Sequence, residues 1–238
     1  MIRVLGPIDL AGPVGVVTIG SRNLRAVLGG LVIGVGHAVP ADRLQYCVWG
    51  DDPPRSADNS LQSYVSRLRQ LLGHDVIVTE DHSYQLVVAA DAIDAVVFER
   101  LLLQAIEARS EPDRCQPLCR DALRLWRGPP FGELADEEPF DLEAQRLDEL
   151  RISTMELSLE AELALGRLEL VVGELESAVE EYPYRERFWY LLIEGLQRDD
   201  RRVEAMRACM QLRSVLAEVG LDSTPRLDEL EAQILNAD

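Results

Sequence analysis

The sequence pattern changes near Ala90, and this change limits the folds that the chain can adopt. Before it, apolar stretches that alternate like strands flank helical stretches, whereas the pattern after it is helical almost throughout. The charge changes at the same place: residues 1–90 hold 7 Arg against 8 Asp and Glu, and residues 91–238 hold 17 Arg against 34. We therefore predict two domains, 1–90 and 91–238, of which only the first can approach a polyanion without strong repulsion.

The first ninety residues predict strands, then three helices, then a hairpin. Residues 2–10 alternate like one strand, residues 11–15 form a turn, and residues 16–20 form a second strand. The first predicted helix covers residues 22–35 after an N-cap at Ser21, and the second covers residues 40–50 and ends at Gly50. A third helix follows an N-cap near Ser56 or Asp58, and residues 76–88 form the hairpin. This order is the layout of a winged helix-turn-helix with an N-terminal sheet.

The third helix has two unlike sides. At 100° per residue its apolar side chains fall within about 60° of arc and should face the core; they are Leu61, Val65, Leu68 and Leu72. The opposite side carries Asn59, Ser63, Ser66, Arg67 and Gln70. Arg69 flanks the apolar stripe, and Arg55 lies in the loop before the helix.

The polar side of this helix suits a nucleic-acid groove. Short side chains allow close approach, while amide and guanidinium groups can bond to base edges and phosphates. No carboxylate lies between Asn59 and Gly73, which is unusual in a chain with a formal charge of −18. The simpler interpretation, the solvated side of an ordinary surface helix, stays open, and for Arg69 a structural ion pair is as good an interpretation as a phosphate contact.

The second part of the chain predicts helices and an internal repeat. Helices are expected over 94–109, over 114–128 with Pro117 in its first turn, and from about Phe140 to Leu165. Beyond these, a shift of 34 residues aligns Arg167 with Arg201, Val171 with Ala205 and Leu175 with Cys209, with Asp200 in place of Gly166. Paired helices with this period are typical of tetratricopeptide repeats. A charged helix face explains the many carboxylates of residues 134–149.

Several long motifs now support a family resemblance. The stretches "RVLGPIDL", "WGDDPPRSADNSLQSYVSRLR" and "YQL" resemble the DNA-binding domain of Streptomyces antibiotic regulatory proteins (SARP, or AfsR-type activators). The stretches "ALRLWRGPPFGELADEEPF" and "EVGLDSTPRLDELEAQIL" resemble the bacterial transcriptional activator domain that follows it in that family. The chain departs from the family at the hairpin tip: the family usually carries Arg and Gly before the tyrosine of the wing, whereas here Glu80 and Asp81 lie at the tip.

The resemblance implies a mainly α fold with a small β component. An OmpR-like winged helix would place its third helix in the major groove of promoter DNA, with Arg67 and Arg69 matching the family's arginines. A helical, tetratricopeptide-like domain would follow it and contact the RNA polymerase holoenzyme. Binding to direct repeats is implied, with a homodimer on DNA as one form. Larger relatives carry ATPase or other added domains, and we expect none here, so nothing in this chain should sense a nucleotide.

Other function classes find little support in the sequence. There is no phosphate-binding loop, no nucleophile motif and no metal-ligand spacing, so we predict no enzyme, no cofactor and no metal. No stretch resembles a signal peptide or a membrane span, and the four cysteines should be reduced and structural, so a cytoplasmic protein is expected. The alternative to an activator is an interaction protein with weakened DNA binding that titrates a partner regulator or kinase.

Overall fold

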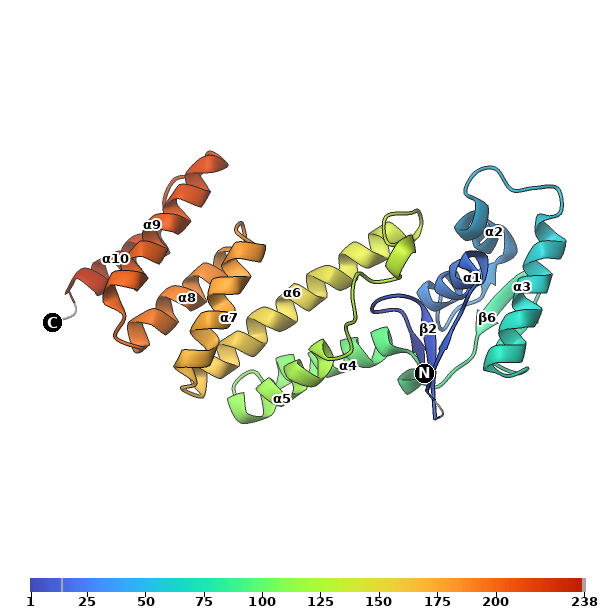
Figure 1. Cartoon of the computed structure of the whole chain (residues 1–238), viewed down its shortest axis with the longest axis horizontal. Helices are drawn as coiled ribbons and strands as arrows, with labels where there is room; N and C mark the ends of the chain where they lie inside the picture. Colours follow the sequence, from blue (N-terminus) through green and yellow to red (C-terminus); the bar gives the residue numbers. More distant parts are fainter. Residues whose placement is uncertain (14, 237–238) are drawn as a thin grey trace. The chain divides into compact units, whose positions relative to one another are not determined.

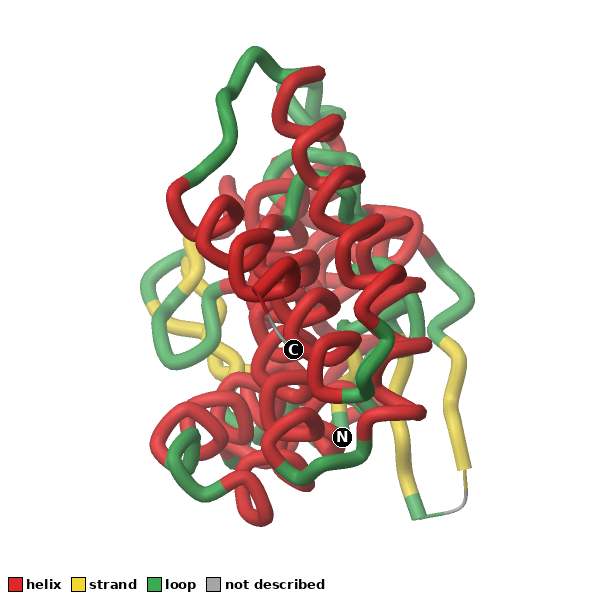
Figure 2. The backbone as a smooth tube through the Cα atoms, turned by 90° about the vertical axis from the view of Figure 1, so that its left-hand side faces the viewer, coloured by secondary structure: helices red, strands yellow, loops and turns green. Residues whose placement is uncertain are grey.

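The computed structural model describes residues 1–13 and 15–236, and it is mainly helical with short strands (Figures 1 and 2). The chain divides into two compact units. The first comprises Met1–Leu102 and Asp121–Ile152, and the second comprises Leu103–Arg120 together with the chain from Ser153 onward. The compact units therefore divide the chain differently from the boundary near Ala90 that the sequence pattern suggests, because a later segment joins the first unit.

A three-stranded antiparallel sheet opens the first unit. Its strands are β1 (Ile2–Arg3), β2 (Asp9–Gly12) and β3 (Gly15–Thr18), in the order β1-β2-β3. The prediction of one strand over residues 2–10 is wrong, because the chain leaves the sheet after Arg3. Of the predicted turn at 11–15, Val14 lies outside the described residues.

The break between β1 and β2 has a clear structural cause. The carbonyl of Val4 accepts a hydrogen bond from the backbone N–H of Phe131 (2.7 Å), and that of Leu5 accepts one from Arg127 (2.8 Å). Gly6 then turns the chain with a φ of 141°, a conformation that favours glycine. Residues more than a hundred positions away thus provide the hydrogen bonds that a continuous strand would otherwise have made.

Three helices and a hairpin follow in the predicted order (Figure 1). The elements are α1 (Arg22–Ile33), β4 (Val39–Pro40), α2 (Ala41–Trp49), α3 (Ala57–Leu72), β5 (Ile77–Glu80) and β6 (Ser83–Leu86). β4 was not predicted; it pairs with β6 and makes a second three-stranded sheet, in the order β4-β6-β5. The side chains of Ser21 and Ser56 occupy the N-cap positions of α1 and α3 but make no capping hydrogen bond.

Close packing explains why α1 tolerates glycines that weaken a helix. A Cβ atom at Gly29 would lie 2.7 Å from a ring carbon of Phe140, and one at Gly30 would lie 2.8 Å from the Cys47 sulfur. Phe140 itself is fully buried. The helix therefore gives up about 1 kcal/mol of propensity per glycine and gains contact with α2 and with the later segment.

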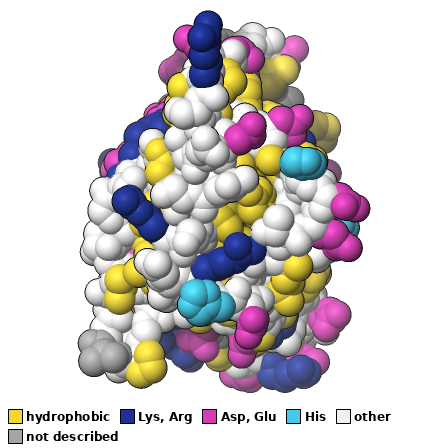
Figure 3. Space-filling model, turned by 90° about the vertical axis from the view of Figure 1, so that its right-hand side faces the viewer, with side chains coloured by type: hydrophobic (Ala, Val, Ile, Leu, Met, Phe, Trp, Pro, Cys, Tyr) yellow, Lys and Arg dark blue, Asp and Glu magenta, His cyan; other side chains and the backbone are white. Residues whose placement is uncertain are grey.

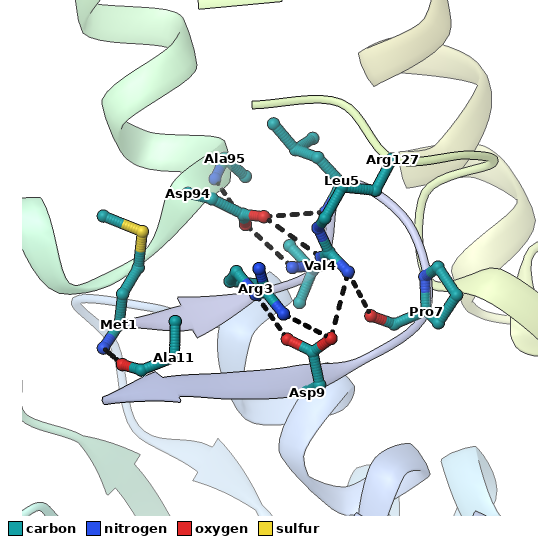
Figure 4. Close-up of polar contacts among 10 residues, drawn as sticks. All are labelled: Met1, Arg3, Val4, Leu5, Pro7, Asp9, Ala11, Asp94, Ala95 and Arg127. Carbon is teal, nitrogen blue, oxygen red and sulfur yellow. Dashed lines mark hydrogen bonds and ion pairs between the residues drawn. The ribbon is translucent and has the colours of Figure 1, made fainter. Parts of the chain in front are cut away.

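A buried carboxylate ties the N-terminal sheet to the segment after it (Figure 4). Asp94, at the start of α4 (Asp94–Glu107), is 1% exposed. Its two oxygens accept hydrogen bonds from the backbone N–H groups of Val4 (2.8 Å), Leu5 (3.1 Å) and Ala95 (2.8 Å). Burial raises the pKa of this carboxyl, while the three N–H donors and the nearby Arg127 act in the opposite direction.

Arg127 extends this contact into a network of charges. Its guanidinium lies 3.5 Å from Asp94 and donates hydrogen bonds to Asp9 and to the carbonyl of Pro7, both at 3.1 Å. Asp9 also accepts two hydrogen bonds from Arg3, at 2.5 and 2.7 Å. We call Arg3, Asp9, Asp94 and Arg127 the Asp94 network, and Figure 4 shows how it joins β1 and β2 to two distant segments.

An acidic loop packs on the first two helices. This loop contains the short helix η2 (Gly132–Leu134) and runs to residue 138. Glu133 pairs with Arg25 and Glu137 with Arg22, and the hydroxyl of Tyr46 donates a hydrogen bond to Glu138. The prediction that a charged helix face explains the carboxylates of this region is therefore wrong for Glu137 and Glu138.

The rest of the chain is helical. After η1 (Ala90–Ala92), the helices are α4, α5 (Pro112–Leu123), α6 (Phe140–Ala164), α7 (Leu168–Glu181), α8 (Glu186–Arg198), α9 (Arg202–Glu218) and α10 (Pro225–Asn236). α5 begins at Pro112, a favourable first position for proline, so Pro117 lies inside the helix and not in its first turn. None of the helices in the described ranges is both long and apolar enough to span a membrane.

The 34-residue repeat is visible in the backbone. α7 and α9 begin at equivalent positions, after Arg167 and Arg201. The residues before them, Gly166 and Asp200, both have a positive φ, of 75° and 59°, so Asp200 reproduces the turn that glycine makes in the first copy. The aligned core positions Val171 and Ala205 are equally buried, at 1% and 0% exposed.

The Asp94 network yields a first prediction. In Asp94→Asn the side chain keeps one acceptor oxygen and presents an amide donor to backbone N–H groups, so at least one buried donor loses its partner. We expect a loss of stability of about 1–3 kcal/mol, measured by urea unfolding of the full chain. The control Asp121→Asn, whose exposed carboxylate lies 3.5 Å from Arg124, should change stability by no more than about 0.5 kcal/mol. Equal effects would remove the special role of Asp94.

The composition of the first unit yields a second prediction. A fragment of residues 1–90 lacks Asp94, Phe131 and Phe140, whereas a fragment of residues 1–152 keeps all three. We expect the longer fragment to unfold cooperatively and the shorter one to be markedly less stable, with poorer dispersion of amide signals in NMR spectra. Equal stability of the two fragments would support a boundary near Ala90 instead.

Candidate nucleic-acid interface

The two sides of α3 are as different in the structure as in the sequence. Leu61, Val65 and Leu68 are at most 1% exposed and face the core. Leu72, the fourth member of the predicted stripe, is only half-buried because the helix ends there. The core side thus fixes the rotation of the helix about its axis, and with it the side chains that point outward.

Every residue predicted for the outer face of α3 is exposed. The structure brings together on this face Asn59, Ser63, Ser66, Arg67 and Gln70. Figure 3 shows the α3 side of the molecule, where most surface atoms are neutral, basic side chains are scattered among them, and most acidic side chains lie toward the periphery of the view. A polar surface that carries cations and lacks carboxylates is compatible with close approach to a nucleic acid.

The arginines of residues 1–90 fall into two groups. Four have partners within the first unit; these are Arg3, Arg22, Arg25 and Arg69. The other three, Arg43 on α2, Arg55 in the α2–α3 loop and Arg67 on α3, are exposed. Their guanidinium groups make no hydrogen bond or ion pair with any described residue. These three belong to consecutive elements, so the free positive charge of this region is concentrated on α2, α3 and their connecting loop.

Arg43 was missed by the sequence reasoning. Helical spacing would not have singled it out. No carboxylate lies three or four positions from Arg43, but the same is true of Arg22, Arg25 and Arg69, which all have intramolecular partners.

Arg69 does not belong to the free group. Its guanidinium donates hydrogen bonds to the carbonyl of Ile77 (2.9 and 2.6 Å) and to the hydroxyl of Thr79 (2.8 Å). The structure thus uses Arg69 to join α3 to β5 through a carbonyl and a hydroxyl, so the ion pair considered as an alternative is not formed, and the DNA contact of Arg69 stays a prediction. Its role is to set the hairpin against the helix.

Other contacts hold α3 from the opposite side. The side-chain amide of Asn23 on α1 donates a hydrogen bond to the hydroxyl of Tyr64 (2.9 Å), and the rings of Tyr64 and Trp49 lie 6.2 Å apart. Near the N-terminus of the helix, Gln45 donates a hydrogen bond to Asp58 (2.7 Å). These contacts fix the outer face before any ligand is bound, which lowers the entropy cost of binding.

The hairpin that follows α3 ends in an acidic tip. A two-residue turn connects β5 to β6, and both of its residues, Asp81 and His82, have a positive φ, of 41° and 60°. The carbonyl of His82 accepts a hydrogen bond from Ala41 (2.9 Å), which holds the turn against α2. The side chains of Glu80 and Asp81 are exposed and make no ion pair with a described residue. The tip therefore carries uncompensated negative charge.

Comparison with known proteins gives the family. The model of the bacterial transcriptional activator domain matches residues 93–235. The regulatory protein DnrI of Streptomyces peucetius is 32% identical, over 100% of this chain and 92% of its own length. The chain belongs to the SARP family of transcriptional regulators. The predicted resemblance is therefore confirmed.

SARP-family relatives differ in length. The regulatory protein AfsR of Streptomyces griseus is 35% identical over 99% of this chain, but the chain spans only 24% of that relative. Among solved structures, Mycobacterium tuberculosis EmbR in complex with a low-affinity phosphopeptide matches with a TM-score of 0.91 and 32% identity. That match covers 98% of this chain and 64% of EmbR, so the mainly helical fold with small sheets is shared with a family member.

The role found for Arg69 yields a third prediction. Arg69→Ala removes three hydrogen bonds between α3 and the β5 strand, so we expect a loss of about 1–2 kcal/mol in stability, measured by urea unfolding. The control Arg43→Ala removes an exposed arginine that has no partner among the described residues, and it should stay within about 0.5 kcal/mol of wild type. An Arg69→Ala protein as stable as wild type would show that the link to β5 contributes nothing.

Proposed function

We propose that this chain is a transcriptional activator whose first unit contains a winged helix-turn-helix that binds double-stranded promoter DNA in a sequence-specific manner. The observation that supports this most is the grouping of three unpaired, exposed arginines on α2, the α2–α3 loop and α3. Arg67 lies on the carboxylate-free face of α3, and every other arginine of residues 1–90 apart from these three has an intramolecular partner. In this proposal α3 lies in the major groove and β5–β6 form the wing.

In this proposal, different side chains on and near α3 make different kinds of contact with DNA. Arg67 carries two donors that can read a guanine edge, and the Asn59 amide carries a donor and an acceptor that can read an adenine edge. Ser63 and Ser66 leave room for the helix to approach the bases. Arg43 on α2 and Arg55 in the α2–α3 loop would contact phosphates, which fixes the register of the protein on DNA without reading sequence. Gln70 extends the polar face toward the end of the helix.

The helical remainder of the chain would connect the bound promoter to transcription. Residues 93–235 match the bacterial transcriptional activator domain. The 34-residue repeat of α7 and α9 is typical of tetratricopeptide-like arrays, which bind other proteins. We propose that this part contacts the RNA polymerase holoenzyme, and that two copies can occupy repeated promoter elements.

An interaction protein with weakened DNA binding is the second candidate. The acidic tip of the hairpin favours it, because Glu80 and Asp81 would repel a phosphate backbone if the tip approached DNA. The excess of carboxylates after residue 90 favours it too. Such a protein would act by titrating a partner regulator or kinase. Selection of duplexes from a random pool separates the two functions, since only a sequence-reading activator should enrich a defined motif.

Replacement of Arg67 tests the proposed reading face. In Arg67→Ala we expect binding to the selected duplex to weaken by about 1–3 kcal/mol, measured by equilibrium titration, because a bidentate base contact is lost. The thermal stability should be unchanged, since the side chain is exposed and without a described partner. Wild-type affinity in this variant would show that the assigned face is wrong.

Leu68 provides the matched control on the other side of the helix. It is fully buried, so Leu68→Ala should leave a cavity and destabilise the protein by about 2–5 kcal/mol. The two neighbouring positions should therefore separate DNA binding from folding. Arg67→Ala should lose affinity for DNA, and Leu68→Ala should lose stability.

The acidic tip yields a prediction of its own. If the tip lies within about a Debye length of the phosphates, Glu80→Gln/Asp81→Asn should tighten DNA binding at low salt and lose this advantage as salt rises. The gain should be similar for the selected duplex and for random DNA, because phosphate proximity carries no sequence information. Titrations of both duplexes at several salt concentrations check this. Unchanged affinity at low salt would mean that the tip is turned away from DNA.

A further inference from the structure

A groove crosses the repeat helices of the second unit. α7 and α9 both pack on α8, and the space between them has a volume of about 320 Å³. Its floor is formed by Trp189, Leu192 and Leu196 of α8. We call this space the α7–α9 groove. It lies entirely within one compact unit, so its shape is set by the packing of neighbouring repeat helices.

The floor of the α7–α9 groove is apolar and held firmly. Trp189, Leu192 and Leu196 are at most 5% exposed. The indole N–H of Trp189 donates a hydrogen bond to the carbonyl of Pro183 (2.8 Å), which fixes the ring and satisfies its only polar atom. A floor of this kind offers an apolar side chain a preformed surface, without a polar group that would need a partner.

The walls of the groove are polar and mostly acidic. Glu176 and Glu180 come from α7, and Glu204 and Arg207 come from α9. Arg201, outside the lining, pairs with Glu204 at 2.6 Å and lies 3.5 Å from Glu176. Glu180 forms no ion pair within the described ranges. The carboxylates of the lining thus outnumber its single arginine, and one of them is free to meet a cation.

This combination of floor and walls selects the chemistry of a ligand. Nucleic acids and phosphopeptides carry negative charge and would be repelled by the glutamates, in a protein whose formal charge is already −18. A cationic peptide would be attracted, and an apolar side chain on it could cover the floor. Arrays of helical repeats commonly bind partners along a surface of this kind.

We propose that the α7–α9 groove docks a short basic segment of a partner protein, whose arginine or lysine side chains meet Glu176 and Glu180 and whose apolar side chain covers Trp189 and Leu192. This docking is independent of the proposed DNA binding, because it uses other residues in the other compact unit. In this proposal the acidic helical part of the chain binds its partner at a defined groove and not only through non-specific electrostatic attraction.

The test uses the full chain and a labelled twelve-residue peptide of alternating arginine and leucine, followed by fluorescence anisotropy. In Glu176→Gln/Glu180→Gln, binding should weaken about fivefold or more at roughly 0.15 M salt. The matched control is Glu169→Gln/Glu229→Gln, which removes the same charge from exposed positions outside the groove lining. Its affinity should stay within about twofold of wild type. A second peptide with serine in place of leucine should bind more weakly than the first to wild type.

A second pair of variants does not depend on losing a carboxylate. Gln211 is exposed and lines the groove, so Gln211→Arg should repel the peptide, whereas Gln233→Arg on α10 should not. Melting temperatures identify any variant that fails to fold. Equal weakening in the groove and control variants, or equal binding of the leucine and serine peptides, would overturn the proposal and leave only non-specific attraction. Binding of a glutamate–leucine peptide with similar affinity would overturn it as well.

Discussion

The carboxylate of Asp94 holds together segments that the chain order keeps apart. It binds the amides of Val4 and Leu5, and Arg127 lies beside it. A buried charge is costly unless hydrogen bonds and an opposite charge surround it, and here both are present. Because these partners belong to the N-terminal strand region and to the segment after α5, the network completes a core that neither segment could close alone.

The orientation of the proposed DNA-binding face depends on this core. Phe140 packs against Gly29 on α1, and the acidic loop covers the arginines at the start of the same helix. α1 in turn holds α3 through Asn23 and Tyr64. The loop carboxylates thus neutralise Arg22 and Arg25, and the cations that remain available lie on the side of α2 and α3. Intramolecular pairing therefore decides where the first unit is positive.

Local patterns in the sequence were sufficient to predict the order of the helices and to choose most residues of the proposed DNA-binding face. The leucine stripe fixed which side of α3 faces inward, so the exposed polar face followed at once. Arg69 could not be placed in this way, because its angle on the helix does not reveal a carbonyl on β5. The break after Arg3 was equally hidden, since it depends on bonds to Arg127 and Phe131. The repeat was visible because α7 and α9 preserve their buried positions and their turn at a constant spacing.

The first unit is built from two separate stretches of the chain, and this affects how it can fold during translation. The strands, α1, α2, α3 and the hairpin leave the ribosome first, but Phe140 and the rest of the segment 121–152 follow only later. At roughly 5–20 residues per second, the interval between residue 90 and residue 152 lasts roughly 3–12 seconds. During most of that time the glycine-rich surface of α1 has no ring to cover it, and the carbonyls of Val4 and Leu5 lack the N–H groups of Phe131 and Arg127. A nascent chain at this stage is a natural client for chaperones, and a pause in translation before residue 152 would prolong its exposure.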